Sequence, residues 1–174
     1  MAEPPAPGHA GPPVGGPPAP PRPGQPQADL HWLREAIELS RRCPPSQSAF
    51  SVGAVLVSDA GTVIATGYSR ERDPKDHAEE VALARAAGDP LLTGATLYSS
   101  LEPCLARASR PRSCAELIIE AKIPRVVIAW LEPPLFVAGG GAGTLRHAGV
   151  TVVEIPWLAG LARSVNAHLV GDEN

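Results

Sequence analysis

The sequence predicts an α/β domain, because a β-hairpin is followed by strands and helices that alternate along the chain. Two apolar runs, 52–57 and 62–67, flank a turn at 59–61, and this arrangement is typical of a hairpin. Strands that alternate with helices are typical of parallel strands joined by helical crossovers, with helices on both faces of one sheet. The three later strands are expected at 95–100, 125–130 and 150–155.

The first helix is expected to begin near Asp29, a suitable N-cap, and to end before Pro44. Ser113 and Glu116 have capping-box spacing and are expected to open a later helix. The remaining helices are expected at 77–87, at 114–122, after a glycine-rich loop at 139–143, and at 157–169.

Residues 1–28 differ from the rest of the chain because they hold eleven of its 21 prolines. Such a stretch buries too little apolar surface to offset its ordering entropy. We expect it to be a disordered or polyproline-II tail, either inert or a ligand for a proline-recognition domain. The folded domain is then expected over 29–174.

Charge and cysteine content exclude several classes of protein. The net charge of −3 gives no general attraction to nucleic acid or to an anionic membrane, and no apolar run is long enough to span a bilayer. Three cysteines are an odd and sparse set, which argues against a secreted disulfide scaffold. We therefore expect reduced thiols and a cytoplasmic protein.

Three residues of the types that bind zinc fall at the ends of predicted elements. His77 and Cys114 open predicted helices, and Cys104 follows a predicted strand. A helix N-terminus lowers the pKa of a thiol, and thiolate is the form that binds metal. One nitrogen and two sulfur ligands suit Zn²⁺ and leave a fourth tetrahedral position open to water, whose pKa bound zinc lowers toward 7. The sequence therefore predicts a catalytic zinc site.

Glu79 lies two residues from His77, where its carboxylate can reach a water on the metal. In zinc deaminases, an H-x-E motif, a Pro-Cys pair and a second cysteine supply the site, and the glutamate acts as general acid and base. His77-Ala-Glu79, Pro103-Cys104 and Cys114 follow this pattern. We therefore predict a hydrolytic deaminase of a pyrimidine-type ring, with Glu79 as its proton shuttle.

Each of these residues also has a simpler interpretation. Asp76 and Glu79 have capping-box spacing, so Glu79 could serve only to cap its helix. Cys104 and Cys114 could be small buried apolar residues. Cys43 could complete a closed, structural zinc site.

Several segments of the chain carry a resemblance to a known family: Val52-Gly-Ala-Val55, His77-Ala-Glu-Glu80, Gly94-Ala-Thr-Leu-Tyr98, Leu101-Glu-Pro-Cys104, Arg110-Pro111, Cys114–Ala121, Arg125–Ala129 and Val137–Gly141. Over about residues 30–155 the chain resembles the cytidine deaminase superfamily, and within it the pyrimidine deaminase of riboflavin biosynthesis. The resemblance implies a three-layer α/β/α sandwich with a five-stranded mixed sheet, assembled as a homo-oligomer (dimer or tetramer). It also implies His77, Cys104 and Cys114 as zinc ligands and Glu79 as proton shuttle.

The resemblance favours a phosphorylated pyrimidine of the riboflavin pathway as substrate. A cytidine or deoxycytidylate deaminase of nucleotide or specialised metabolism is the alternative. A tRNA adenosine deaminase would need a basic surface, which the net charge of −3 does not indicate. A non-enzymatic, zinc-stabilised binding module would have no use for the carboxylate of Glu79.

The chain departs from the family where substrate contacts are expected. Ser48–Ser51 stands where the family has Pro-Asn-Pro, Glu132–Leu135 replaces its Asp-Pro-Asn-Pro loop, and Gly140 replaces a lysine. Arg107 and Arg110 lie between the zinc cysteines, where guanidinium groups would bind a substrate phosphate or remain ordinary surface charges. We expect Arg110, Arg107 and Ser51 to contact the substrate.

Overall fold

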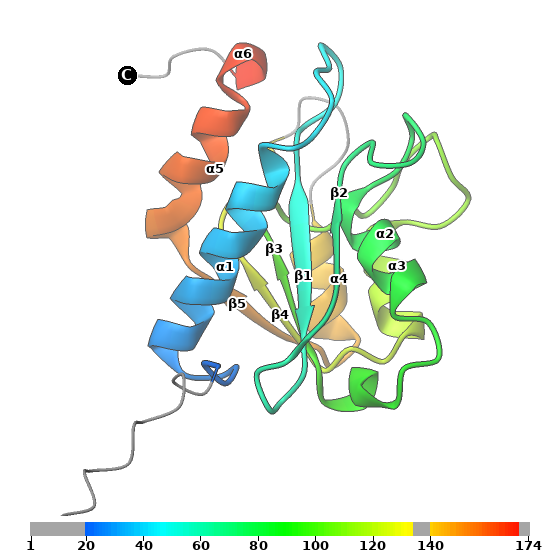
Figure 1. Ribbon diagram of the computed structural model, residues 1–174. Coiled ribbons are helices and arrows are strands. Elements are labelled where there is room, and N and C mark those ends of the chain that lie inside the picture. The colour runs from blue at the N-terminus through cyan, green and yellow to red at the C-terminus, as the bar shows by residue number, and fades with distance from the viewer. Residues whose placement is uncertain (1–19, 134–139, 171–174) are drawn as a thin grey trace, which may run out of the picture.

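A five-stranded mixed sheet forms the middle layer of the protein in the computed structural model, which describes residues 20–133 and 140–170 (Figure 1). Its strands are β1 (Gly53–Val57), β2 (Val63–Tyr68), β3 (Thr96–Ser99), β4 (Arg125–Ile128) and β5 (Thr151–Glu154). The strand order is β2-β1-β3-β4-β5. β1 is antiparallel to both β2 and β3, whereas β3, β4 and β5 are parallel. The predicted hairpin and the predicted mixed sheet are both confirmed.

Helices cover both faces of this sheet, so the domain has the three layers that were expected (Figure 1). α1 and α5 lie on one face, and α2, α3 and α4 lie on the other. The helices and 3₁₀ turns are α1 (Pro26–Ser40), α2 (Ala78–Arg85), η1 (Pro90–Gly94), α3 (Cys114–Glu120), α4 (Gly141–His147), η2 (Pro156–Leu158), α5 (Ala159–Val165) and α6 (Ala167–Val170).

Two glycines in the hairpin let the helices approach the sheet closely. A Cβ atom on Gly53 would lie 2.1 Å from the carbonyl oxygen of Ala36 in α1. A Cβ atom on Gly67 would lie 2.4 Å from the carbonyl oxygen of Ala78 in α2. Real Cβ contacts are not this short. Glycine at these two positions therefore allows α1 and α2 to pack closely against opposite faces of the β1–β2 hairpin.

The first helix begins earlier than the sequence predicted. Its N-cap is Gln25, and Pro26 occupies the first turn, where its fixed φ suits a helix. The choice of Asp29 as N-cap is therefore wrong. Ala28, expected in the tail, is buried, and Trp32 donates a hydrogen bond from Nε1 to the carbonyl of Pro21 (2.8 Å). Residues 1–19 of the expected tail lie outside the described residues.

Asp29 instead lies in a buried cluster that we call the anchor cluster, made of Asp29, Tyr98 and Arg125. The Tyr98 hydroxyl donates to Asp29 Oδ1 (2.7 Å), and Arg125 donates to both carboxylate oxygens (2.9 and 2.7 Å). Burial raises the pKa of Asp29, but the hydrogen bonds and charge of its partners outweigh burial and leave the pKa lowered. The anchor cluster thus ties α1 to β3 and β4 near the start of β4.

The C-terminal helix is interrupted, which the sequence analysis did not predict. Between α5 and α6 lies Asn166, whose side chain is buried. Its Oδ1 accepts from the backbone N–H of Ser51 (2.7 Å), and its Nδ2 donates to the carbonyl of Ser51 (3.0 Å). A tertiary contact therefore replaces continuous helix here. No helix in the described part of the chain is both long and apolar enough to cross a bilayer.

Candidate active site

Three predicted ligands come together beyond the carboxyl end of β3, and we call them the ligand cluster: His77, Cys104 and Cys114. His77 is the N-cap of α2, and Cys114 is the first residue of α3, whose N-cap is Ser113. Ser113 and Glu116 form the predicted capping box, with Glu116 Oε2 accepting from the N–H of Ser113 at 2.7 Å. Two helix starts and one strand-end loop thus present the three side chains to one another.

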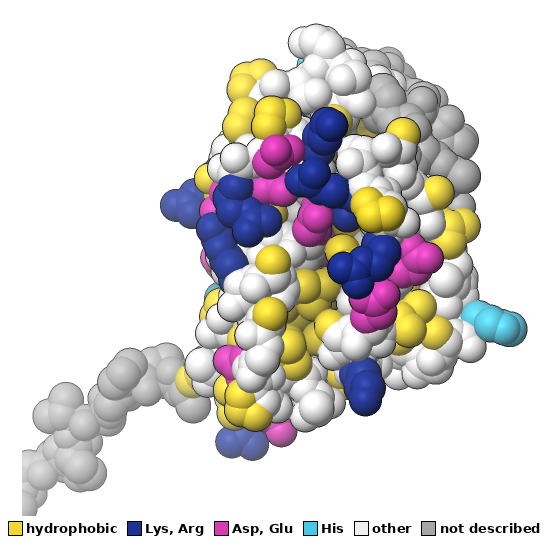
Figure 2. Space-filling view, turned by 90° about the vertical axis from the view of Figure 1, so that its right-hand side faces the viewer, with side chains coloured by type: hydrophobic (Ala, Val, Ile, Leu, Met, Phe, Trp, Pro, Cys, Tyr) yellow, Lys and Arg dark blue, Asp and Glu magenta, His cyan; other side chains and the backbone are white. Residues whose placement is uncertain are grey.

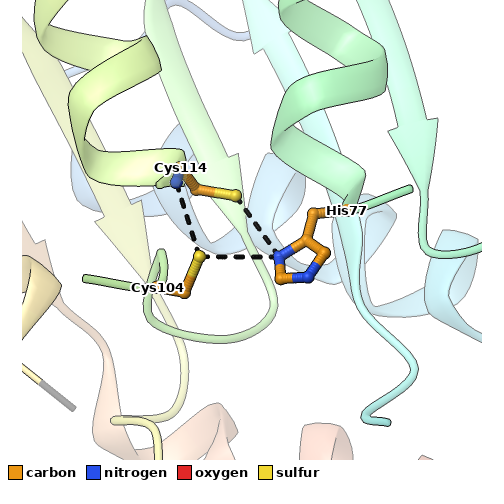
Figure 3. A group of neighbouring side chains, drawn as sticks. All are labelled: His77, Cys104 and Cys114. Carbon is orange, nitrogen blue, oxygen red and sulfur yellow. Dashed lines mark hydrogen bonds between the residues drawn. The ribbon is translucent and has the colours of Figure 1, made fainter. Parts of the chain in front are cut away.

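The ligand atoms of this cluster converge (Figure 3). His77 Nδ1 lies 3.6 Å from Cys104 Sγ and 3.4 Å from Cys114 Sγ, and all three atoms fall within 4.8 Å of one another. Ligands held about 2.0–2.3 Å from a tetrahedral zinc lie about 3.5 Å apart. The separations therefore fit one shared zinc ion.

The charges of the ligand cluster also suit a metal. Hydrogen bonds from Cys114 and His77, opposed by burial, lower the pKa of the Cys104 thiol to about 4, so Cys104 is a thiolate at neutral pH. The backbone N–H of Cys114 also donates to Cys104 Sγ (3.4 Å). Burial lowers the pKa of His77, but the contact with Cys104 and the nearby negative charges outweigh it and raise the pKa overall.

Glu79 is buried beside the ligand cluster and does not cap its helix. The N–H of His77 donates to Glu80 Oε2 (3.5 Å), so Glu80 holds the capping-box position of α2. Glu79 Oε1 instead accepts a hydrogen bond from the Ser99 hydroxyl (3.0 Å). Burial raises the pKa of Glu79 above its usual value. The interpretation of Glu79 as only a helix cap is therefore wrong.

A cavity of about 280 Å³ opens onto these groups. Its wall includes His77, Glu79 and Cys104, and also Glu102 and Glu132. Glu132 Oε2 is buried and has no hydrogen-bond partner among the described residues. Burial, together with the nearby charges of Cys104, Glu79 and Glu102, raises the pKa of Glu132 to about 8.

Glu102 connects the metal-ligand loop to the segment after β4. Its Oε1 accepts from the N–H groups of Gly140 (3.2 Å) and Ala142 (2.8 Å), and its Oε2 accepts from the N–H of Glu132 (3.0 Å). Gly141 packs so tightly there that a Cβ atom on it would lie 1.7 Å from the carbonyl oxygen of Pro103. The loop that carries Cys104 is therefore held firmly against the start of α4.

Cys43 and Ser51 both lie away from the ligand cluster. Cys43 lies outside the ligand cluster, and its Sγ donates to the carbonyl of Val52 (3.4 Å), so it is not a fourth metal ligand. Ser51 is not among the residues on the cavity wall. Its backbone is held by Asn166, and its hydroxyl accepts from Arg70 Nη2 (2.9 Å). Its substrate contact stays a prediction.

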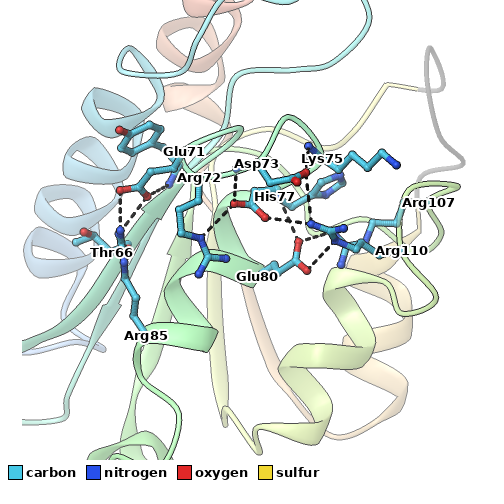
Figure 4. Close-up of polar contacts among 12 residues, drawn as sticks. Thr66, Glu71, Arg72, Asp73, Lys75, His77, Glu80, Arg85, Arg107 and Arg110 are labelled. Carbon is cyan, nitrogen blue, oxygen red and sulfur yellow. Dashed lines mark hydrogen bonds and ion pairs between the residues drawn. The ribbon is translucent and has the colours of Figure 1, made fainter.

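The arginines between the two cysteines are paired with carboxylates (Figure 4). Arg107 Nη1 donates to Glu80 Oε2 (2.9 Å), and its side chain is only 3% exposed. Arg110 forms ion pairs with Glu80, Asp76 and Asp73 at 3.4–3.5 Å and is not on the cavity wall, whereas Arg107 is. Arginines and carboxylates also interleave across this face of the protein (Figure 2). The predicted phosphate contacts of Arg107 and Arg110 would compete with these ion pairs.

Sequence reasoning missed four polar side chains of this region: Arg70, Lys75, Glu102 and Asn166. Glu102 sits in the Leu101-Glu-Pro-Cys104 segment, so its position beside a ligand was a usable signal. Arg70, Lys75 and Asn166 carried no such signal, because folding alone brings them to the cavity or to Ser51.

Comparisons with known proteins agree with this site. A family model described as the cytidine and deoxycytidylate deaminase zinc-binding region matches residues 26–130. A Schizosaccharomyces pombe protein named diaminohydroxyphosphoribosylamino-pyrimidine deaminase is 41% identical over 133 residues, which are 75% of this chain and 33% of that protein. The riboflavin biosynthesis protein RibD of Actinobacillus pleuropneumoniae is 40% identical over 72% of this chain. The chain spans about a third of the length of these relatives.

Solved structures show the same fold. RibD of Acinetobacter baumannii superposes with a TM-score of 0.68 at 34% identity, covering 82% of this chain and 40% of that one. The Rib2 deaminase of Aspergillus oryzae superposes with a TM-score of 0.67 at 26% identity, covering 84% of this chain and 93% of that one. Another structure of that fungal deaminase, with a TM-score of 0.66, is described as a complex with DARIPP.

Proposed function

Because the chain belongs to the cytidine and deoxycytidylate deaminase family, we propose that it is a zinc-dependent hydrolase that deaminates a phosphorylated pyrimidine of riboflavin biosynthesis. One observation carries the proposal: His77 Nδ1 and the sulfurs of Cys104 and Cys114 converge beside the buried carboxylate of Glu79. Three ligands and an adjacent carboxylate are the composition of a catalytic zinc site rather than of a closed, structural one.

The residues present fit the metal. His77, Cys104 and Cys114 would hold Zn²⁺, since their separations and the thiolate of Cys104 match its preferences. When bound, the zinc would supply Lewis-acid chemistry that activates water at neutral pH. The hydrogen bond with Cys104, together with burial, raises the pKa of the Cys114 thiol, so Cys114 would give up its proton on binding the metal.

Glu79 would move the protons of the reaction. In hydrolytic deamination, water adds to the ring carbon that bears the amine, the carbon–nitrogen bond breaks, and a carbonyl and ammonia result. Glu79 would take a proton from the water and deliver protons to the ring nitrogen and to the leaving amine. The hydrogen bond from Ser99 orients this carboxylate toward the cavity, on whose wall Glu79 lies.

The proposed substrate rests on the relatives and on the size of the cavity. Both curated relatives reported above are named for riboflavin biosynthesis or for its pyrimidine deaminase, and the fungal deaminase is described with DARIPP bound. A cavity of about 280 Å³ suits a small molecule. A homo-oligomer, dimer or tetramer, remains the expected assembly, and a cytoplasmic location accords with three free cysteines.

A substrate panel tests the proposal. Zinc-loaded protein is offered the phosphorylated riboflavin-pathway pyrimidine, deoxycytidylate, cytidine and guanine, and ammonia release is measured. We expect release from the first compound, loss of activity after the metal is stripped, and recovery on adding Zn²⁺. Release from deoxycytidylate or cytidine alone would instead establish the alternative substrate class. No release from any compound by zinc-loaded protein would overturn the proposed activity.

A further inference from the structure

The cavity wall carries two cations that the proposed chemistry does not use. Arg70 and Lys75 both line the cavity and both belong to the loop between β2 and α2. The N–H of Arg70 donates to the carbonyl of Asp76 (2.9 Å) and closes this loop. Arg70 has a φ of 61°, a left-handed conformation that is uncommon for a residue with a side chain and is often found at functional sites.

The charge of Arg70 meets only neutral acceptors. Nε donates to the carbonyl of Pro44 (2.9 Å), Nη1 to the carbonyl of Phe50 (2.9 Å), and Nη2 to the hydroxyl of Ser51 (2.9 Å). Within the described residues, no carboxylate forms an ion pair with it. Asn166, which holds Ser51 from the other side, keeps this arrangement in place. Arg70 is thus a positioned positive charge without a negative partner.

Lys75 is the second cation of this kind. Its side chain is exposed and forms no hydrogen bond or ion pair within the described residues, whereas its backbone N–H donates to Asp73 Oδ1 (2.8 Å). In Figure 4 the ammonium of Lys75 takes part in none of the contacts drawn. The neighbouring carboxylate on the wall, Asp76, is already paired with Arg72 (3.2 Å) and Arg110 (3.4 Å). It therefore leaves the charge of Lys75 uncompensated.

We propose that Arg70 and Lys75 bind the phosphomonoester of the substrate, an assignment that rests on the proposed function. A phosphate dianion accepts charge-assisted hydrogen bonds from both guanidinium and ammonium groups. Arg107 and Arg110 are already neutralised by Glu80 and its acidic neighbours, so a phosphate would first have to break those pairs. Lys75 has no ion pair to break within the described residues. Arg70 donates four of its five side-chain N–H groups to neutral acceptors, but one N–H on Nη2 and an uncompensated charge remain for the phosphate.

The test measures the phosphate preference, defined as kcat/KM for the phosphorylated substrate divided by kcat/KM for the same molecule without its phosphate. Lys75→Gln breaks no hydrogen bond or ion pair among the described residues. It should lower this preference about tenfold, mainly by lowering kcat/KM for the phosphorylated substrate. Arg70→Gln should lower it at least as much, and Arg70→Lys should lower it less. Arg41→Gln removes one positive charge from an exposed ion pair with Glu38 on α1, away from the cavity wall, and should leave the preference unchanged.

Binding of ribose 5-phosphate to the zinc-loaded protein, measured by calorimetry, provides a readout that does not need turnover. We expect binding to the unaltered chain and at least fivefold weaker binding to Lys75→Gln. No binding to the unaltered chain, or equal binding to both, would overturn the assignment. So would an unchanged phosphate preference in both Lys75→Gln and Arg70→Gln, above all if Arg110→Gln abolished it. Inactivity of the unaltered chain on every substrate would contradict the proposed function, while the binding assay would still decide the phosphate site.

Discussion

The anchor cluster and the ligand cluster are both buried and polar, and they lie toward opposite ends of the same parallel strands. In the anchor cluster, Asp29 receives hydrogen bonds from Tyr98 and from both Nη atoms of Arg125, so its charge is fully matched. Around the ligand cluster, Glu79 and Glu132 have raised pKa values, and one oxygen of Glu132 has no partner among the described residues. A buried carboxylate whose charge and hydrogen bonds are satisfied by partners stabilises a fold. A buried carboxylate that lacks such partners is typical of a functional site.

The largest expected effect is a loss of activity without a loss of stability. Glu79→Gln should slow ammonia release about 100- to 10,000-fold, since the amide cannot carry protons. The folded protein should be as stable as before or more so, because burial disfavours the native carboxylate. Steady-state kinetics and thermal melting of zinc-loaded samples measure the two effects. Activity above a tenth of the original would contradict the role of Glu79 as proton shuttle.

The converse change affects the anchor cluster. Asp29→Asn leaves Arg125 partly buried and unpaired, so it should lower the free energy of unfolding at pH 7 by about 3 kcal/mol. Activity per folded molecule should be unaffected. Because the folded-state pKa of Asp29 is lowered, its stabilising contribution is present above pH 4 and is lost as the pH falls through that pKa. The difference between the variant and the original chain should therefore shrink below pH 4.

Urea denaturation at a series of pH values measures this contribution. The control is Glu35→Gln, an exposed carboxyl on the same helix, which should change stability by less than about 0.5 kcal/mol. An equal effect of both variants would show that the anchor cluster is no more than an exposed ion pair.

The smallest expected effect concerns Glu132. Its folded-state pKa is raised to about 8, so the chain should lose stability as the pH rises from about 4.5 through 8 and Glu132 ionises. Glu132→Gln should remove this loss. At pH 9 its free energy of unfolding should exceed that of the original chain by about 1 kcal/mol, after a discount for partial exposure. Thermal melting of metal-free samples at pH 5 and pH 9 tests this. A pH-independent difference would contradict the raised pKa.

The clusters also differ in how far the sequence revealed them. The three ligands and Glu79 were predicted because they match the H-x-E, Pro-Cys and second-cysteine pattern of zinc deaminases and fall at the ends of expected elements. The strands were recognisable as apolar runs. The hairpin, the alternation of later strands with helices, and the capping box at Ser113 are likewise local patterns. Short-range signals therefore sufficed for the sheet and for the ligand cluster.

Long-range partners could not be predicted in this way. Asp29 has the chemistry of an N-cap. Nothing nearby in the sequence indicates that Arg125 and Tyr98 will donate hydrogen bonds to its carboxylate. Asn166 interrupts the last helix, where its side chain accepts a hydrogen bond from the backbone N–H of Ser51, 115 residues away in the sequence. Arg107 and Arg110 resemble phosphate ligands until folding sets Glu80 and Asp76 beside them.

The absence of a side chain at Gly141 limits how this protein can be redesigned. Anything larger there would collide with the carbonyl of Pro103 and displace the neighbouring Cys104. A design that replaces the loop after β4 must therefore keep glycine at this position.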